Sequence, residues 1–536
     1  MRRLFTSRGP LARFGALAHG GPLAHGAESG QRGAMAHGGE SERCGPLAHG
    51  GKPGQRGALV HGGESERFGA LAHGGESERC GPLAQRVGSK RFGPLARCGT
   101  LAAILMACAA AAFAAGETVL IQNADIYPVT GAPMKGASLL IQDGRIVEIG
   151  AKIVTPKGAT VLDVKGLRVY PGWIDSATQL GLEEIESIRE TEDTGEIGDF
   201  VPQLKALSAV NPDSEHFGVV RVNGITSAIA LPTGTGGGRG GGNPQLISGQ
   251  AALIHTDGWT WEEMEISRSA AMCLTFPAAA GRGARGGGMP SDLQDALAGV
   301  ATAGNARRAV LDQIAKLNAF FDDARKYKTA KAANLPDFRK DLRFEAMLPV
   351  IEGKMPLAVN ASRAAAIHDA IAWSEKQNVK IVILRPRDLT KAGPELKAKN
   401  VPVILGPVLA LPENEDSEYD EGYTQPLEAY KAGVKFALGT FTNEFVRDLP
   451  YQAATAVAYG LPHDEAMKAL TINPAQIWGA GDLVGSLEKG KLADLMIVDG
   501  DPMDVRTQIR HLFIKGKEIT LSNKQIRLYE RYMSRQ

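Results

Sequence analysis

The sequence predicts an α/β protein in which a (β/α)8 TIM-type barrel over residues 169–480 adjoins a β-sandwich built from residues 116–168 and 481–536. Two observations predict this fold. Between the β-rich ends, apolar runs of strand length alternate with amphipathic stretches of helix length, as a (β/α) barrel requires. The β-rich ends contain no helical pattern, and each needs partner strands to bury its apolar face.

Composition sets broad limits on size and on partners. The chain has 536 residues, of which 43% are apolar and 22% are charged, so it can form a large core and several domain-sized units. Its formal net charge of +1 gives no reason to expect nucleic acid or an anionic membrane as a partner.

Residues 1–98 form a low-complexity repeat. Within it, one histidine recurs every 12 residues, at His25, His37, His49, His61 and His73. The unit holds too few apolar residues to build a core, so we expect disorder, with a His-rich metal-binding tract as the alternative. The regular period also suggests that the start of the chain has been placed too early.

Residues 99–115 are typical of a secretory signal peptide. Basic residues up to Arg97 precede an apolar run from Leu101, which ends in the cleavage pattern Ala112-Phe113-Ala114. The run is mostly alanine and shorter than the roughly 20 apolar residues of a membrane anchor. We expect a chain that begins near Val87, matures near Ala115, leaves no membrane attachment and is periplasmic or secreted. Of five cysteines, only Cys273 would remain, which excludes an intramolecular disulfide in the mature protein.

Both ends of the mature chain contain short β-strands around turns. Asp143-Gly144 is a strong hairpin signal between two of them. Because neither end can close a sandwich alone, we expect them to pair. The expected strands are Thr118 to Asn123, Ala137 to Asp143, Gly144 to Ile149, Thr160 to Val164, residues 490–502 and Ile509 to Ile519.

The barrel begins with the apolar stretch Val169 to Leu180, which passes a Pro-Gly turn and presents Asp175, Ala177 and Gln179 at alternating positions. Amphipathic stretches follow several later strands, for example Arg363 to Glu375 and Tyr451 to Tyr459. The later strands are expected at Ile225 to Leu231, Gln250 to His255, Pro356 to Asn360, Val379 to Leu384, Pro402 to Leu405 and Lys435 to Leu438.

Two glycine tracts, residues 234–243 and 281–288, interrupt the barrel region. They lack the Gly-Lys-Ser/Thr of a phosphate-binding loop. An RGG-type RNA segment is the other functional alternative. We expect flexible loops at the barrel face instead, which could cover a pocket.

Two distant motifs resemble the metal-dependent amidohydrolase superfamily, in its imidazolonepropionase-like branch. They are Pro171-Gly172-Trp173-Ile174-Asp175 at the first barrel strand and Gly485 to Leu495 before the final β segment. The resemblance implies hydrolysis of non-peptide carbon-nitrogen bonds with zinc or another divalent metal. It also implies metal-binding histidines after strands one, five and six, a lysine or glutamate after strand four, and an aspartate after strand eight that takes a proton from metal-bound water.

The chain departs from that pattern at the ligand positions. Ala177 and Gln179 stand at the first histidine pair, Asn360 at the strand-five histidine and Phe441 at the aspartate, while the next strand ends Leu384-Arg385-Pro386-Arg387 without histidine. Methyl and phenyl groups cannot bind a cation, and a carboxamide is a weak zinc ligand. We therefore expect a degenerate metal site with no metal cofactor. The remaining histidines have no metal-ligand spacing; they are His216, His255, His368, His463 and His511.

Two hypotheses on function stay open. The first is an exported amidohydrolase-type hydrolase that acts by an unusual route, for example through the carboxylates that crowd residues 183–199 together with Glu444. The second is a pseudoenzyme that binds a small polar molecule, as a homo-oligomer or paired with an active homologue. No catalytic residue is assigned, and the candidate pocket residues are Asp175, Gln179, Asn360, Thr440 and Asn443, whose amides and hydroxyls suit hydrogen bonding.

Overall fold

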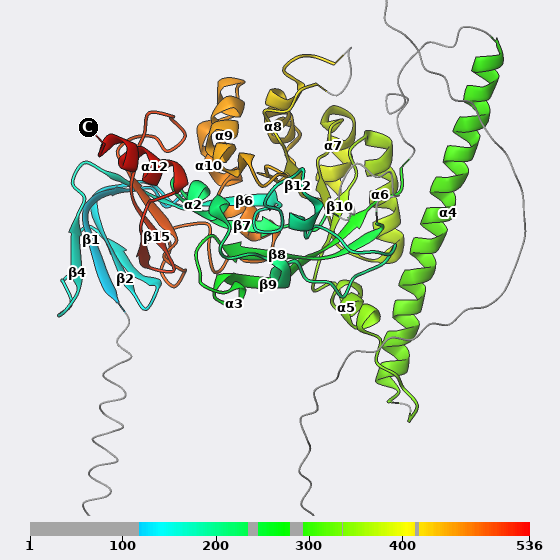
Figure 1. The fold of residues 1–536 in the computed structure, drawn as a ribbon, viewed down its shortest axis with the longest axis horizontal. Coiled ribbons are helices and arrows are strands. Elements are labelled where there is room, and N and C mark those ends of the chain that lie inside the picture. The colour runs from blue at the N-terminus through cyan, green and yellow to red at the C-terminus, as the bar shows by residue number, and fades with distance from the viewer. Residues whose placement is uncertain (1–116, 234–244, 279–292, 335, 413–416, 536) are drawn as a thin grey trace, which may run out of the picture. The chain divides into compact units, whose positions relative to one another are not determined.

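A computed structural model describes residues 117–233, 245–278, 293–334, 336–412 and 417–535 (Figure 1). The expected repeat, the signal peptide and both glycine tracts lie outside these residues. Within them, no helix is both long enough and apolar enough to cross a membrane.

The two ends of the described chain share one eight-stranded mixed sheet. Its N-terminal part is joined to its C-terminal part by antiparallel pairing of Val169 in β5 with Ile497 in β14. Hydrogen bonds link all eight strands into a single sheet, where the sequence predicted a sandwich. The strands are β1 (Thr118–Ile126), β2 (Met134–Gln142), β3 (Arg145–Gly150), β4 (Thr160–Asp163), β5 (Arg168–Pro171), β14 (Leu495–Val498), β15 (Ile509–Ile514) and β16 (Lys517–Ile519).

Local sequence explains the turns of this sheet. Asp143 and Gly144 connect β2 to β3 with φ angles of 52° and 76°. Two consecutive positive φ angles are those of the tight hairpin turn that Asp-Gly favours. Apolar residues of both chain ends, including Ile121, Leu139 and Phe513, form the buried core of the sheet.

The second sheet runs in the order β13-β12-β11-β10-β9-β8-β7-β6 and forms a nearly closed barrel. It closes where the Phe441 N–H donates to the Ala177 carbonyl at 2.7 Å. The strands are β6 (Trp173–Thr178), β7 (Ile225–Ala230), β8 (Ile247–His255), β9 (Glu265–Thr275), β10 (Leu357–Asn360), β11 (Ile381–Leu384), β12 (Val403–Leu405) and β13 (Phe436–Leu438).

One barrel strand departs from the all-parallel arrangement that the sequence predicted. Strand β8 is antiparallel to both β7 and β9. Only residues 256–264 join β8 to β9, including the short helix α3 (Trp261–Met264). A parallel pair needs a crossover of about a dozen residues or more, so this short connection returns as a hairpin. Strand β9 was not predicted, because its first half is polar and only its second half is buried.

Helices cover the outside of the barrel. Figure 1 shows α6, α7, α8 and α9 in a row along one flank. Alternation along the strands separates two cores: Ala358 and Val382 point into the barrel, while Leu357 and Ile383 face the helices. The helices are α2 (Glu215–Arg221), α4 (Leu293–Ala332), α5 (Leu342–Ile351), α6 (Ala364–Gln377), α7 (Leu389–Ala398), α8 (Glu421–Ala432), α9 (Leu449–Ala458), α10 (His463–Ala469), α11 (Ile472–Ile477) and α12 (Lys524–Met533).

Candidate functional site

A small cavity of about 200 Å³ opens at the carboxyl ends of the parallel barrel strands. We call it the mouth cavity. Three sequence-predicted positions lie in its wall, namely Gln179 after β6, Asn360 at the end of β10, and Phe441 after β13. The complete lining is Gln179, Leu231, Pro232, Thr233, Ser248, Cys273, Leu274, Thr275, Ala358, Asn360, Leu384, Arg385 and Phe441.

Arg385 also lines the mouth cavity, although it was not among the predicted pocket residues. The family resemblance implied a histidine at this strand end. Arg385 follows the last residue of β11, and its guanidinium carbon lies 4.2 Å from the centre of the Phe441 ring. One guanidinium nitrogen also donates to the Phe441 carbonyl at 3.3 Å. An arginine directly after a buried strand, Ile381 to Leu384, was the available signal in the sequence.

The backbone of both partners is unusual. Arg385 has φ of 52° and Phe441 has φ of 56°, in the left-handed region that costs non-glycine residues about 1 kcal/mol or more. Surrounding protein and the nearby Arg387 charge lower the pKa of the Arg385 guanidinium to about 10. Desolvation by the surrounding protein is the larger cause, although the side chain as a whole is exposed at the mouth. A solvent-accessible cation stacked on an aromatic ring is thus held at the end of strand β11.

Asp175 and Thr440 do not line the mouth cavity. Both are fully buried, and the Thr440 hydroxyl donates to one Asp175 carboxyl oxygen at 2.6 Å. The backbone N–H groups of Ala177 and Thr440 each donate to the other oxygen at 3.1 Å. Burial raises the pKa of the Asp175 carboxyl to about 7, against the lowering effect of these three donors. The carboxyl group therefore clamps β6 to the segment after β13 and closes the barrel.

A larger cleft of about 950 Å³ adjoins the mouth cavity and shares Gln179 and Phe441 with it. Asn443 lies in this acidic cleft, and its amide donates to the Glu183 carbonyl at 2.9 Å. Burial raises the pKa of the Glu183 carboxyl, and the neighbouring charges of Glu192, Glu186 and Glu444 raise it further. The acidic cleft is lined by Gln179, Glu183, Ile185, Glu186, Ser187, Glu192, Thr194 and residues 441–445.

Comparisons with known proteins agree with this architecture. Residues 375–519 match the model of the amidohydrolase family. A solved amidohydrolase from Thermotoga maritima MSB8 is similar over 75% of this chain and 99% of its own, with 26% identity and a TM-score of 0.61. The chain is thus similar to amidohydrolases in residues 375–519 and in its fold.

Other relatives are matched over a smaller share of their own length. Amidohydrolase tasK of Hapsidospora irregularis is 24% identical over 463 residues, which cover 75% of this chain and 43% of tasK. The chain thus spans less than half of that relative. An imidazolonepropionase of Porphyromonas gingivalis is 41% identical, but over 71 residues that cover 12% of this chain and 17% of the relative. Membership of the imidazolonepropionase-like branch therefore stays a prediction.

The residues at the expected amidohydrolase ligand positions do not fit a metal ion. Ala177 and Phe441 pack in the apolar interior of the barrel, and Ala177 lies so close to Gly439 that an added Cβ there would approach it to 3.0 Å. The carboxamides of Gln179 and Asn360 are weak donors for zinc. In the part of the chain that the structure describes, no group of three or more His, Cys, Asp or Glu side chains could hold a metal.

The five described histidines lie outside both cavities and mostly pair with carboxylates. His463 bonds to Asp501 at 2.8 Å and His511 to Glu518 at 2.7 Å, while His368 pairs with Glu395. The buried His255 lies 3.5 Å from Asp494, and its pKa is lowered chiefly by burial. His216 contacts the Glu184 carbonyl at 3.2 Å. These contacts are structural and leave no imidazole at the barrel mouth.

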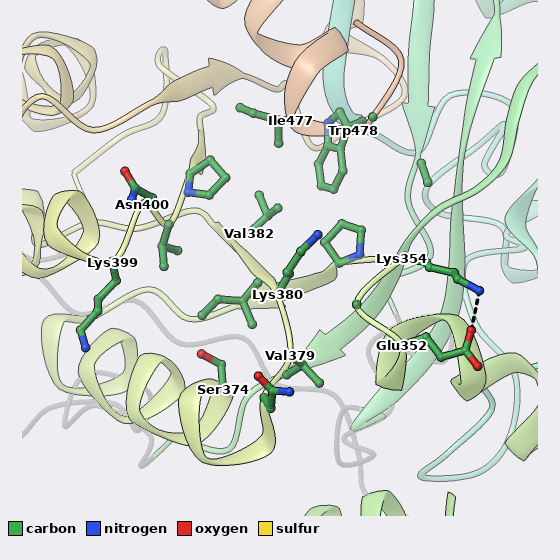
Figure 2. A pocket seen from close by; sticks show the side chains of 18 of the residues that line it. Glu352, Lys354, Ser374, Val379, Lys380, Val382, Lys399, Asn400, Ile477 and Trp478 are labelled. Carbon is green, nitrogen blue, oxygen red and sulfur yellow. Dashed lines mark hydrogen bonds and ion pairs between the residues drawn. The ribbon is translucent and has the colours of Figure 1, made fainter. Parts of the chain in front are cut away.

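A third hollow, of about 810 Å³, lies at the opposite end of the barrel, beside the residues that precede β10, β11 and β12. Figure 2 shows Lys380 extending into it, while Lys354 pairs with Glu352 at 2.7 Å. Ile477 and Trp478, at the end of α11, line its far wall (Figure 2). Barrel chemistry occurs at the carboxyl ends of the strands, so this hollow is not the candidate site.

Proposed function

We propose that the barrel mouth of this amidohydrolase-like protein binds a small polar molecule without a catalytic metal ion. One observation carries the proposal: the polar part of the mouth cavity consists of amides, hydroxyls and a guanidinium. Such groups orient a ligand by hydrogen bonds but do not ionise water. The protein would then be a binding pseudoenzyme, acting as a homo-oligomer or together with an active homologue.

Metal content tests the first half of this proposal. The purified full chain is dialysed against metal-free buffer, and zinc, iron and manganese are measured by mass spectrometry. We expect well below one equivalent of each. One tightly held equivalent, together with carbon-nitrogen hydrolysis that a chelator abolishes, would overturn the proposal.

Ligand location tests the second half. A library of small polar molecules is screened for a rise in melting temperature, and each hit is measured again with Gln179→Leu and Asn360→Ala. Both substitutions remove an amide from the mouth cavity. The matched control is Lys380→Gln, which removes a polar group from the hollow at the other end of the barrel. Hits should be lost in the mouth variants alone; hits sensitive only to Lys380→Gln would contradict the mouth site.

The acidic cleft favours a second candidate function, hydrolysis of a non-peptide carbon-nitrogen bond without metal. The raised pKa of Glu183 supports a role as a general acid. Several similar proteins bear hydrolase names, such as the N-substituted formamide deformylase of Arthrobacter pascens, which is 44% identical over 64 residues. Release of amine from formamides and cyclic amides, resistant to chelators and lost in Glu183→Gln, would support hydrolysis. Equal rates in both proteins would refute this role.

Export remains part of the proposal. It depends on the signal pattern at residues 99–115. Mass spectrometry of the protein from a periplasmic or culture fraction should find a mature N-terminus near Ala115, whereas peptides from residues 1–80 in that fraction would contradict it.

A further inference from the structure

The mouth cavity contains a positive charge that the described protein does not neutralise. Arg385 lines the cavity, and no ion pair joins it to a carboxylate among the residues that the structure describes. Elsewhere, the half-buried Arg221 has Asp257 at 3.0 Å. Arg385 is exposed at the mouth, so an anion that enters the cavity can reach its guanidinium directly and form charge-assisted hydrogen bonds with it.

The guanidinium is also held in place. One face stacks on Phe441, with the guanidinium carbon 4.2 Å from the ring centre, and one N–H donates to the Phe441 carbonyl at 3.3 Å. A guanidinium has five N–H donors in a planar fork, which matches the two oxygens of a carboxylate. Stacking and the hydrogen bond restrict its rotation, so less side-chain entropy is lost when a ligand binds.

Two amides complete the polar wall. The side chains of Gln179 and Asn360 line the cavity, and neither amide hydrogen-bonds to the residues that the structure describes. The volume of about 200 Å³ is below the roughly 300–1,000 Å³ of sites for drug-sized ligands. The cavity therefore suits a ligand smaller than a drug molecule, with one anionic end.

We propose that the mouth cavity binds a small carboxylate, whose oxygens pair with the Arg385 guanidinium while Gln179 and Asn360 bond to the remainder of the molecule. This inference rests on the proposed binding function and adds the ligand class. It requires no metal and no covalent step.

Calorimetric titration of the purified full chain tests the charge requirement first. The probes are propionate, benzoate and L-proline, each compared with its amide: propionamide, benzamide and L-prolinamide. We expect at least one carboxylate to bind at least tenfold more tightly than its amide. If no carboxylate binds, or if each amide binds equally well, the inference is overturned. Binding of amides alone would leave the binding function standing and remove only the ligand class.

Substitutions of Arg385 then test whether its positive charge binds the carboxylate. Arg385→Gln should weaken carboxylate binding at least tenfold, and Arg385→Lys should weaken it less, because it keeps the charge but loses the fork and the stack. The matched control is Arg531→Gln, which removes an exposed arginine of α12 and should leave binding unchanged. Carboxylate binding that survives intact in a folded Arg385→Gln protein, checked by its melting curve, would overturn the inference.

Discussion

The clamp at Asp175 predicts a specific dependence of stability on pH. Its carboxyl pKa is raised from 3.8 to about 7 by burial, so the folded state keeps a proton that the unfolded chain releases. Stability from this proton is greatest below pH 3.8, falls as pH rises, and is lost above about pH 7. Because one pKa unit corresponds to about 1.4 kcal/mol, the free energy of unfolding should fall by about 3 kcal/mol between pH 5 and pH 8.

Asp175→Asn isolates this effect. The Asn carbonyl can accept from the N–H groups of Ala177 and Thr440, and its amide can donate to the Thr440 hydroxyl, so it copies the neutral acid. The variant lacks the carboxyl group that titrates. The difference in the free energy of unfolding, variant minus parent protein, should therefore be about 3 kcal/mol larger at pH 8 than at pH 5. Urea unfolding followed by tryptophan fluorescence at both pH values measures the difference.

Two controls accompany this measurement. Asp163→Asn removes an exposed carboxylate of β4 and should change stability similarly at both pH values. Asp175→Ala leaves three buried donors without an acceptor, at a cost of about 1–3 kcal/mol each, and should destabilise the fold at both pH values. Parallel pH curves for the parent protein and Asp175→Asn would refute the reasoning, because Asp175 would then be ionised in the folded state.

Three further outcomes follow from the same structure. Thr440→Val removes the hydroxyl that donates to Asp175 at 2.6 Å and should cost about 1–2 kcal/mol in urea unfolding, whereas Thr440→Ser should recover most of it. Burial raises the pKa of the Cys273 thiol to about 12, so peptide mapping after alkylation at pH 8 should find Cys273 unmodified in the folded protein and modified in urea; rapid native labelling would contradict this. The hydrogen bond to Asp501 raises the pKa of His463 above 6.5, so stability from this pair should be present at acidic pH and lost as pH rises through that pKa, by less than about 1 kcal/mol because the imidazole is 41% exposed. An NMR titration should show a lower His463 pKa in Asp501→Asn, and an unchanged one would contradict the assignment.

The sequence predicted those parts of the fold whose signals are local. Alternating apolar residues located seven of the eight barrel strands, and the Asp143-Gly144 turn located the β2–β3 hairpin. It missed β9, whose first half is polar, and the reversal of β8, which depends on the short chain connection to β9. No pattern near Asp175 indicated a partner 265 positions away at Thr440, because that contact exists only once the barrel closes.

The residues of the candidate site were also predicted only in part. Gln179 and Asn360 were predicted from their places at strand ends and lie in the mouth cavity. Arg385 was overlooked as a ligand-binding group, because the expectation at its strand end was a histidine and because its stacking on Phe441 joins residues 56 positions apart. Chemistry that depends on which residues meet across a barrel cannot be read from spacing along one strand.

The segment after β13 explains why the mouth has this form. Thr440 bonds to Asp175, the Phe441 N–H bonds to the Ala177 carbonyl, and the Thr442 carbonyl accepts from the Thr178 hydroxyl. Consecutive residues thus bond to the end of β6, in the region where a metal-dependent relative would present ligands. The same bonds hold Phe441 at positive φ, with its ring under Arg385. Because these interactions share one short segment, loosening the clamp should also disorder the guanidinium, so Thr440→Val should weaken carboxylate binding although it touches no ligand.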